Sequence, residues 1–271
     1  MYRAGVFVSS LLNYVEGVTP VHGFGGFELN AFFRALYTWP DPHALFEFAA
    51  YLIGYRVYVR ARARQGDAIS EPHRFRILAG AAVGALLLSK GMGLGDAILA
   101  GEPFSLGALL RSKSIVGGLL GGLLGVELTK KFLGVRRSSG DLFCFPLMLG
   151  MMIGRVGCFL SGLRDGTYGL PSSLPWAIDF GDGIPRHPTA LYDIAFLLIL
   201  GILLSRVRLP EGGRFALFLT AYLAYRFGVE FLKPAPVTAG GLTFLQWSCL
   251  TGLAYYAVYW IRRIPNERMS R

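Results

Sequence analysis

Charged residues are scarce in this sequence. Of its 271 residues, only 16% are charged while 53% are hydrophobic, and the mean hydropathy is +0.47. A soluble domain carries closer to a quarter charged residues. This shortage excludes a disordered chain and argues against a soluble enzyme with a single core. The composition therefore predicts a polytopic membrane protein.

Cysteines are also few, and no spacing pairs them. Cys144, Cys158 and Cys249 all lie in apolar stretches. An odd number of cysteines without a paired spacing indicates neither a disulfide framework nor a metal site. We therefore expect no metal and no soluble cofactor, and a cysteine in an apolar span is usually an inert small hydrophobe.

Apolar runs of transmembrane length recur along the chain. A bilayer core of about 30 Å needs roughly 20 mostly apolar residues per helix. About seven segments approach that length, at residues 43–60, 75–93, 115–133, 141–161, 188–205, 214–232 and 242–261. The pattern predicts an all-α fold with one integral membrane domain over 1–271. Its remaining parts are an N-terminal interfacial segment, 1–42, and a structured outer-face connector, 162–187.

Basic residues occupy every second connector. They cluster in residues 60–76, 130–137, 206–214 and 262–271. The positive-inside rule puts these connectors in the cytoplasm, with the N-terminus outside and the C-terminus cytoplasmic. Because topology explains the formal net charge of +10, no nucleic-acid partner is expected.

Glycines open the third segment at intervals of four, at Gly117, Gly121 and Gly125, with Gly118 and Gly122 beside them. Such a row makes a smooth helix face that a neighbouring backbone can approach closely. Helix packing is the first interpretation, and room for a lipid chain or headgroup is the alternative.

Ionisable residues interrupt the apolar segments, at Glu47, Lys90, Glu127, Arg155, Asp193, Arg226 and Glu230. Each costs about 2.5–3.5 kcal/mol on insertion scales, so such groups usually face a bundle interior or a wet cavity. Arg226 and Glu230 are four apart and can neutralise each other. Arg155 has no acidic residue one turn away. Two guanidiniums in the outer half of the membrane suit a phospholipid phosphate, because arginine offers a planar fork of donors.

Five short elements resemble the signatures of prolipoprotein diacylglyceryl transferases. GRVGCFLSG at 154–162 resembles G-R-x-G-N-F-x-N-G, and RHPTALYD at 186–193 resembles R-H-P-[ST]-Q-L-Y-E. LPW at 174–176, RFGVEF at 226–231 and LTFLQW at 242–247 are similar to its L-P-W, R-F-x-x-E-F and L-[ST]-x-x-Q-W. Order and spacing agree from about residue 115 to the C-terminus, and the family shares the topology deduced above.

The resemblance implies a transferase that moves a diacylglyceryl group from phosphatidylglycerol to the lipobox cysteine of a prolipoprotein. It implies a multi-pass protein of the bacterial cytoplasmic (inner) membrane, with its active site facing the outer leaflet. It assigns the lipid phosphate to Arg155 and Arg226. The other substrate-binding candidates are Gly154, Gly157, Cys158, Ser161, Tyr192 and Glu230.

The sequence departs from the family where the chemistry is expected. Val116 replaces the histidine of the family's H-G-G, Leu163 replaces the glutamate after the signature, and Cys158 and Ser161 replace its two asparagines. The candidates for a substitute base are Lys113, His187, Asp165 and Glu47, with Lys113 and His187 as the first choices. His187, just before Pro188 at a helix start, is equally suited to anchoring a hydrogen bond. His43 and Tyr51 share a helix face with Glu47.

Two alternatives to the lipoprotein transferase follow from these departures. A non-catalytic phospholipid-binding membrane protein would keep the arginines and lose the other reactive groups. A transferase with a different acceptor would keep the lipid site and change the pocket.

Overall fold

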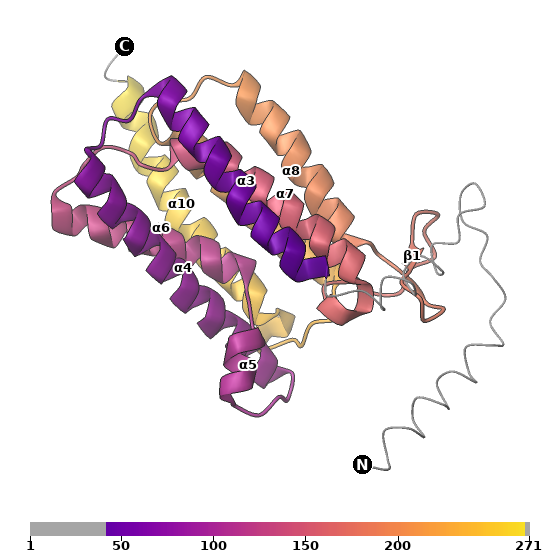
Figure 1. Cartoon of the computed structure of the whole chain (residues 1–271). Helices are drawn as coiled ribbons and strands as arrows, with labels where there is room; N and C mark the ends of the chain where they lie inside the picture. The colour runs from indigo at the N-terminus through magenta and orange to yellow at the C-terminus, as the bar shows by residue number, and fades with distance from the viewer. Residues whose placement is uncertain (1–41, 269–271) are drawn as a thin grey trace.

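The computed structural model describes residues 42–268, and these residues are mostly helical (Figure 1). The long helices are α3 (Pro42–Gln65), α4 (Glu71–Leu99), α6 (Ile115–Leu133), α7 (Cys144–Ser161), α8 (Thr189–Arg206), α9 (Gly213–Val229) and α10 (Phe244–Arg268). The short elements are α5 (Leu106–Arg111), η2 (Asp141–Phe143), η3 (Gly162–Asp165), η4 (Glu230–Leu232) and η5 (Ala239–Gly241). Each predicted apolar segment falls on a long helix. The predicted interfacial segment, up to residue 41, lies outside the described residues.

Four helical segments in the described part of the chain are long and apolar enough to cross a membrane. They are Glu71–Leu99, Asp141–Asp165, Thr189–Arg206 and Gly213–Leu232. Helices α3 and α6 carry clustered basic residues near their ends, Arg62 and Arg64 in one and Lys130 and Lys131 in the other. The fold is therefore that of a helical membrane protein, and the seven-span count stays a prediction.

Side-chain caps fix where α6 and α10 begin. Ser114 accepts a hydrogen bond from the Gly117 N–H at 3.2 Å and starts α6. At α10, Thr243 Oγ1 accepts from the Gln246 N–H at 3.1 Å, and Gln246 Oε1 accepts from the Thr243 N–H at 2.8 Å. This reciprocal arrangement is a capping box. The Thr–x–x–Gln spacing of residues 243–246 thus has a structural cause.

Helices α4 and α6 pack at backbone distance. A Cβ added to Gly121 would lie 2.2 Å from the Gly84 carbonyl oxygen, and one added to Gly125 would lie 2.1 Å from that of Gly80. No side chain fits there, so the packing interpretation of the glycine row is confirmed for this face. A Cβ added to Gly118 would lie 3.8 Å from Ser89 Cβ, and one added to Gly122 would lie 3.7 Å from Ala85 Cβ, so both positions have more space.

The other helices pack beside this pair. Helix α3 lies along α7, and α8 lies on the other side of α7 (Figure 1). Helices α7, α8, α9 and α10 share the hydrophobic core, which contains Met148, Leu197, Phe218, Leu223 and Cys249. Between α7 and α8 the chain forms a connector with two short antiparallel strands, β1 (Ile178–Asp179) and β2 (Pro185–Arg186). We call the end of the bundle next to this connector the connector end.

Candidate functional site

A cavity of about 2210 Å³ lies between the α4–α6 pair and the α3–α7 pair. Small-molecule pockets usually enclose about 300–1,000 Å³, so this space suits a larger ligand. Along the helices its lining includes the small or apolar residues Ala50, Gly54, Ala81, Gly118, Gly122 and Leu147. At the connector end the lining includes His43, Glu47, Lys113, Arg155, Cys158, Asp165, Arg226, Glu230 and Lys233. The opposite end of the lining carries exposed charges, among them Arg136, Arg137 and Glu211, so the connector end differs by having buried charges, and we call it the charged end. The apolar stretch between the two ends suits the acyl chains of a phospholipid.

Two buried arginines share one carboxylate at the charged end. Arg155 Nε lies 2.5 Å from Asp193 Oδ2, and Arg226 NH1 lies 3.7 Å from Asp193 Oδ1. The exposed fractions are 7% for Arg155, 2% for Arg226 and 1% for Asp193. Such charges are stable away from water only when they are paired. The structure therefore brings together the two arginines that the sequence assigned to phosphate.

Arg226 keeps hydrogen-bonding capacity beyond its ion pairs. Its NH2 donates to Glu230 Oε2 at 3.2 Å, so the helical neutralisation deduced from their spacing is present. Its Nε and NH1 have no hydrogen-bond partner among the described residues. Buried donors of this kind are costly unless a ligand or water accepts from them. A phosphate oxygen is a fitting acceptor.

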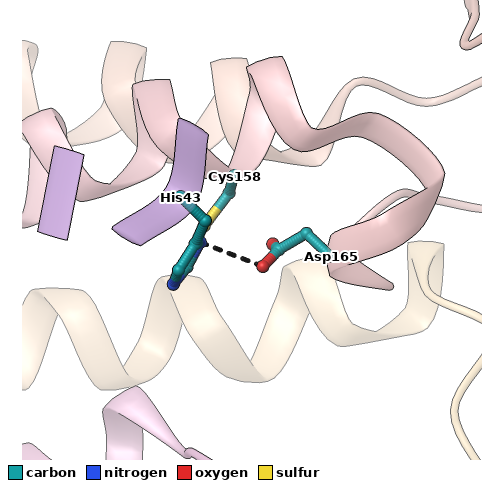
Figure 2. A group of neighbouring side chains, drawn as sticks. All are labelled: His43, Cys158 and Asp165. Atoms are coloured by element: carbon teal, nitrogen blue, oxygen red, sulfur yellow. Dashed lines mark hydrogen bonds and ion pairs between the residues drawn. The ribbon is translucent and has the colours of Figure 1, made fainter. Parts of the chain in front are cut away.

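A histidine, a cysteine and a carboxylate converge at one place in the structure (Figure 2). His43 comes from the first turn of α3, Cys158 from the end of α7, and Asp165 from η3. His43 Nδ1 lies 3.0 Å from Asp165 Oδ1 and 3.7 Å from Cys158 Sγ. Arg155 NH1 lies 3.8 Å from the same sulfur and so connects this cluster to the arginine pair. His43, Cys158 and Asp165 are close enough together to hold one metal ion.

Gly157 explains how His43 reaches Cys158. A Cβ on Gly157 would lie 2.7 Å from Phe46 Cβ and 3.3 Å from His43 Cα. The missing side chain lets the first turn of α3 lie against α7. Gly157 does not belong to the cavity lining, whereas Gly154 and Ser161 do.

Lys113 and Glu47 form an ion pair across the cavity end. Glu47 Oε2 also lies 3.7 Å from His43 Nε2, and Glu47 Oε1 accepts from the Tyr51 hydroxyl at 3.3 Å. The helix face of His43, Glu47 and Tyr51 identified in the sequence therefore faces the cavity. Val116, at the position of the family's histidine, is fully buried in the core.

His187 lies in the connector and Tyr192 in the first turn of α8, and neither belongs to the cavity lining. His187 Nδ1 is 3.1 Å from the Tyr192 hydroxyl, which also accepts a hydrogen bond from Trp176 Nε1 at 2.8 Å. The backbone N–H of His187 donates to the Leu170 carbonyl at 3.1 Å. Both side chains are therefore hydrogen-bonded outside the cavity lining, whereas Lys113, the other first choice for a base, belongs to that lining.

An ion pair closes the β1–β2 turn of the connector. Arg186 donates from NH1 to Asp182 Oδ1 at 2.6 Å and from NH2 to Oδ2 at 2.7 Å. Burial alone would raise the pKa of Asp182, but the Arg186 guanidinium and the Ile184 N–H outweigh it and lower that pKa below its ordinary value.

Three residues of the site, Asp193, His43 and Lys233, could not be assigned to it from the sequence. The sequence presents Asp193 as a charge in an apolar segment and as the end of the 186–193 element, without its arginine partners. It gives no link between His43 and Cys158, and nothing in it distinguishes Lys233. Their signal in the sequence is an ionisable residue within or next to a membrane-length helix. That signal identifies a buried polar site without naming its partners.

Comparison with known proteins gives a consistent result. The sequence model of prolipoprotein diacylglyceryl transferases matches residues 113–262, more than half of the chain. A phosphatidylglycerol–prolipoprotein diacylglyceryl transferase of Bordetella avium is 37% identical over 149 residues, which cover 51% of this chain and 55% of that protein. The same-named protein of Methylococcus capsulatus is 39% identical over 137 residues, 47% of this chain and 50% of that one.

A third similar protein, from Geobacter sulfurreducens and of the same name, extends the match. It is 28% identical over 214 residues, which cover 73% of this chain and 79% of that protein. The chain spans about half the length of the Bordetella and Methylococcus proteins. The family match begins at Lys113, so His43 and Glu47 lie outside it.

Proposed function

Since the chain belongs to the prolipoprotein diacylglyceryl transferase family, we propose that it moves a diacylglyceryl group from phosphatidylglycerol to the lipobox cysteine of a prolipoprotein. Glycerol phosphate is the second product. The similar proteins from Bordetella and Methylococcus are named for this donor and acceptor. The observation that carries the proposal is the buried pair Arg155 and Arg226 at the charged end of an apolar cavity.

In this proposal the lipid phosphate binds between the two arginines. The acyl chains extend along the small-residue lining at Gly118 and Gly122, where no side chain narrows the channel. Gly154, Cys158, Ser161 and Glu230 surround the headgroup, because all four line the cavity near the arginines. Asp193 holds the guanidiniums in place through its two ion pairs.

The reaction needs two kinds of help from the protein. The carbon–oxygen bond to phosphate breaks, and the negative charge that develops on the leaving phosphate needs preorganised donors, which Arg155 and Arg226 supply. The acceptor thiol must also lose its proton before its sulfur can attack. Among the candidate bases, Lys113, Asp165 and Glu47 line the cavity and His187 does not.

The topology that we propose has seven spans in a bacterial cytoplasmic membrane, with the N-terminus outside. The connector end then faces the outer leaflet, because the basic connectors lie at the opposite end. A secreted prolipoprotein would meet the site from that side. All described residues belong to one integral membrane domain in this proposal.

The test is a reconstituted transfer assay. Purified protein is incubated with phosphatidylglycerol and a lipobox peptide, and both glycerol phosphate release and peptide mass are followed. We expect release together with a diacylglyceryl-modified peptide. Release without a modified peptide would overturn the acceptor and point to another one. No release under conditions where a family enzyme works would favour a non-catalytic phospholipid-binding protein.

A further inference from the structure

We propose that His43, Cys158 and Asp165 bind one zinc ion, and that this ion binds and activates the acceptor thiol. The site lies at the charged end of the cavity, next to Arg155. The claim that zinc binds depends only on the three clustered side chains. The claim that zinc activates the thiol also rests on the proposed transfer reaction.

The three side chains offer the ligands that zinc prefers, an imidazole nitrogen, a thiolate sulfur and a carboxylate oxygen. Zinc bond lengths in a tetrahedral site put the nitrogen about 3.4 Å from the oxygen and about 3.6 Å from the sulfur. The corresponding distances from His43 Nδ1 are 3.0 Å to Asp165 Oδ1 and 3.7 Å to Cys158 Sγ. Small side-chain movements are therefore enough to place the ion. With two anionic ligands, the loaded site is electrically neutral.

Contacts around the cluster also match a metal site. A zinc-bound histidine usually gives its other ring N–H to a carboxylate. Here His43 Nε2 faces Glu47 Oε2 at 3.7 Å, and Glu47 is held in turn by Lys113. Asp165 Oδ2 accepts a hydrogen bond from the Thr167 hydroxyl at 2.6 Å, which fixes the carboxylate.

The number of ligands indicates a reactive site and not a structural one. Structural zinc has four protein ligands, whereas catalytic zinc has three and keeps one position open. The described residues supply three ligand groups here, and all three line the cavity. A substrate thiol that approaches through the cavity can take the fourth position.

Zinc would supply the activation that the family's histidine cannot supply in this chain. A thiol bound to zinc is deprotonated, and its proton leaves to water. The bound sulfur attacks the glycerol carbon that carries the phosphate. A carbon–sulfur bond forms, the carbon–oxygen bond breaks, and its electron pair leaves with glycerol phosphate between Arg155 and Arg226. Val116, buried and apolar at the histidine's position, takes no part.

The first experiment measures metal binding without reference to activity. Full-length protein with a histidine-free affinity tag is stripped with a chelator, reloaded with zinc in a metal buffer, and analysed for metal content by mass spectrometry. We expect about one zinc per chain. The variants His43→Ala, Cys158→Ala and Asp165→Asn should hold at least about tenfold less. Cys249→Ala, a buried cysteine away from the cluster, is the matched control and should keep its zinc.

Cobalt(II) provides a first readout in the wild-type protein, which does not depend on variants folding. A cobalt–thiolate bond absorbs in the near ultraviolet, so the reloaded wild type should show this band. It should persist in Cys144→Ala and Cys249→Ala and vanish in Cys158→Ala. Wild type without zinc or a cobalt band, or unchanged zinc in Cys158→Ala, would overturn the metal site.

The second experiment separates this proposal from the transfer function. Zinc-free protein should release glycerol phosphate at least about tenfold more slowly, and zinc but not magnesium should restore the rate. Full activity without metal would overturn the role of zinc and leave the transferase standing, with His43 and Asp165 as a metal-free base. Zinc binding without any transfer would overturn the activation step and the proposed function, while the metal site would stand.

Discussion

The Asp193 carboxylate on α8 lies 2.5 Å from the Arg155 guanidinium on α7, and both groups are buried. The second oxygen of Asp193 faces Arg226 on α9 at 3.7 Å. One anion therefore connects three helices and compensates two cations. Glu230 is a second anion, paired with Arg226 alone, so a lipid phosphate at the same place would be a third.

Replacing Asp193 with Asn should destabilise the bundle, because two buried cations lose their shared partner. Removing one partner of a buried ion pair costs about 3–5 kcal/mol. We expect a lower midpoint of thermal unfolding in detergent. When phosphatidylglycerol is added, this midpoint should rise more in the variant than in wild type. Glu102→Gln, at an exposed carboxylate, is the control. Equal midpoints for both variants would contradict the bridging role.

Arg155→Ala and Arg226→Ala should each weaken phosphatidylglycerol binding while the protein still folds. A hydrogen bond to a charged group contributes about 1.5–3 kcal/mol, so each loss should reduce affinity by at least about tenfold. Arg208→Ala removes an exposed arginine and controls for net charge. Binding to labelled lipid in mixed micelles measures the effect. Unchanged lipid binding in both cavity variants would rule out the phosphate clamp.

Gly84→Ala should separate α4 from α6, since the new Cβ would lie 2.2 Å from the Gly121 carbonyl oxygen. Overpacking of this kind costs about 1–3 kcal/mol. Gly122→Ala is the matched control, because its Cβ would be 3.7 Å from that of Ala85. Thermal unfolding of the two variants should differ clearly. Similar midpoints would mean that the α4–α6 contact adjusts more easily than the structure indicates.

The connector should lose its ion pair in acid. The folded pKa of Asp182 lies below its ordinary value of 3.8, so its stabilising contribution is complete above the unfolded pKa and disappears as the pH falls through the folded one. At pH near 7, Asp182→Asn should be cleaved faster than wild type by a protease acting on the connector. Below about pH 4, this difference should shrink when an acid-active protease is used. A constant difference across the range would exclude the Asp182–Arg186 pair as its cause.

The helices could be predicted from the sequence because length and hydropathy are local properties. Segment 115–133 coincides with α6, whose start is fixed by the Ser114 cap. The glycine row also has a local signature, and its packing face was correctly deduced. Segment 75–93 lies inside the longer helix α4, which runs from Glu71 to Leu99 and includes Asp96.

The partners within the site could not be predicted, because they are distant in the sequence. Arg155 lacks an acidic neighbour one turn away, yet Asp193 reaches it from the next helix. The expectation of no metal relied on cysteine spacing, which does not reveal that His43, Cys158 and Asp165 converge from α3, α7 and η3. His187 precedes a helix, and its sequence context could not decide between a base and an anchor. Its contact with Tyr192 depends on how the connector folds.

Helix α6 carries two rows of glycines, one in close contact with α4 and one that lines the cavity. Gly121 and Gly125 are fixed by contact with α4, where no larger residue fits. Gly118 and Gly122 border the cavity, where a larger residue would shorten the channel instead of parting the helices. A larger residue at Gly118 or Gly122 would therefore change the length of the cavity, while the neighbouring contact of Gly121 and Gly125 with α4 stays as it is.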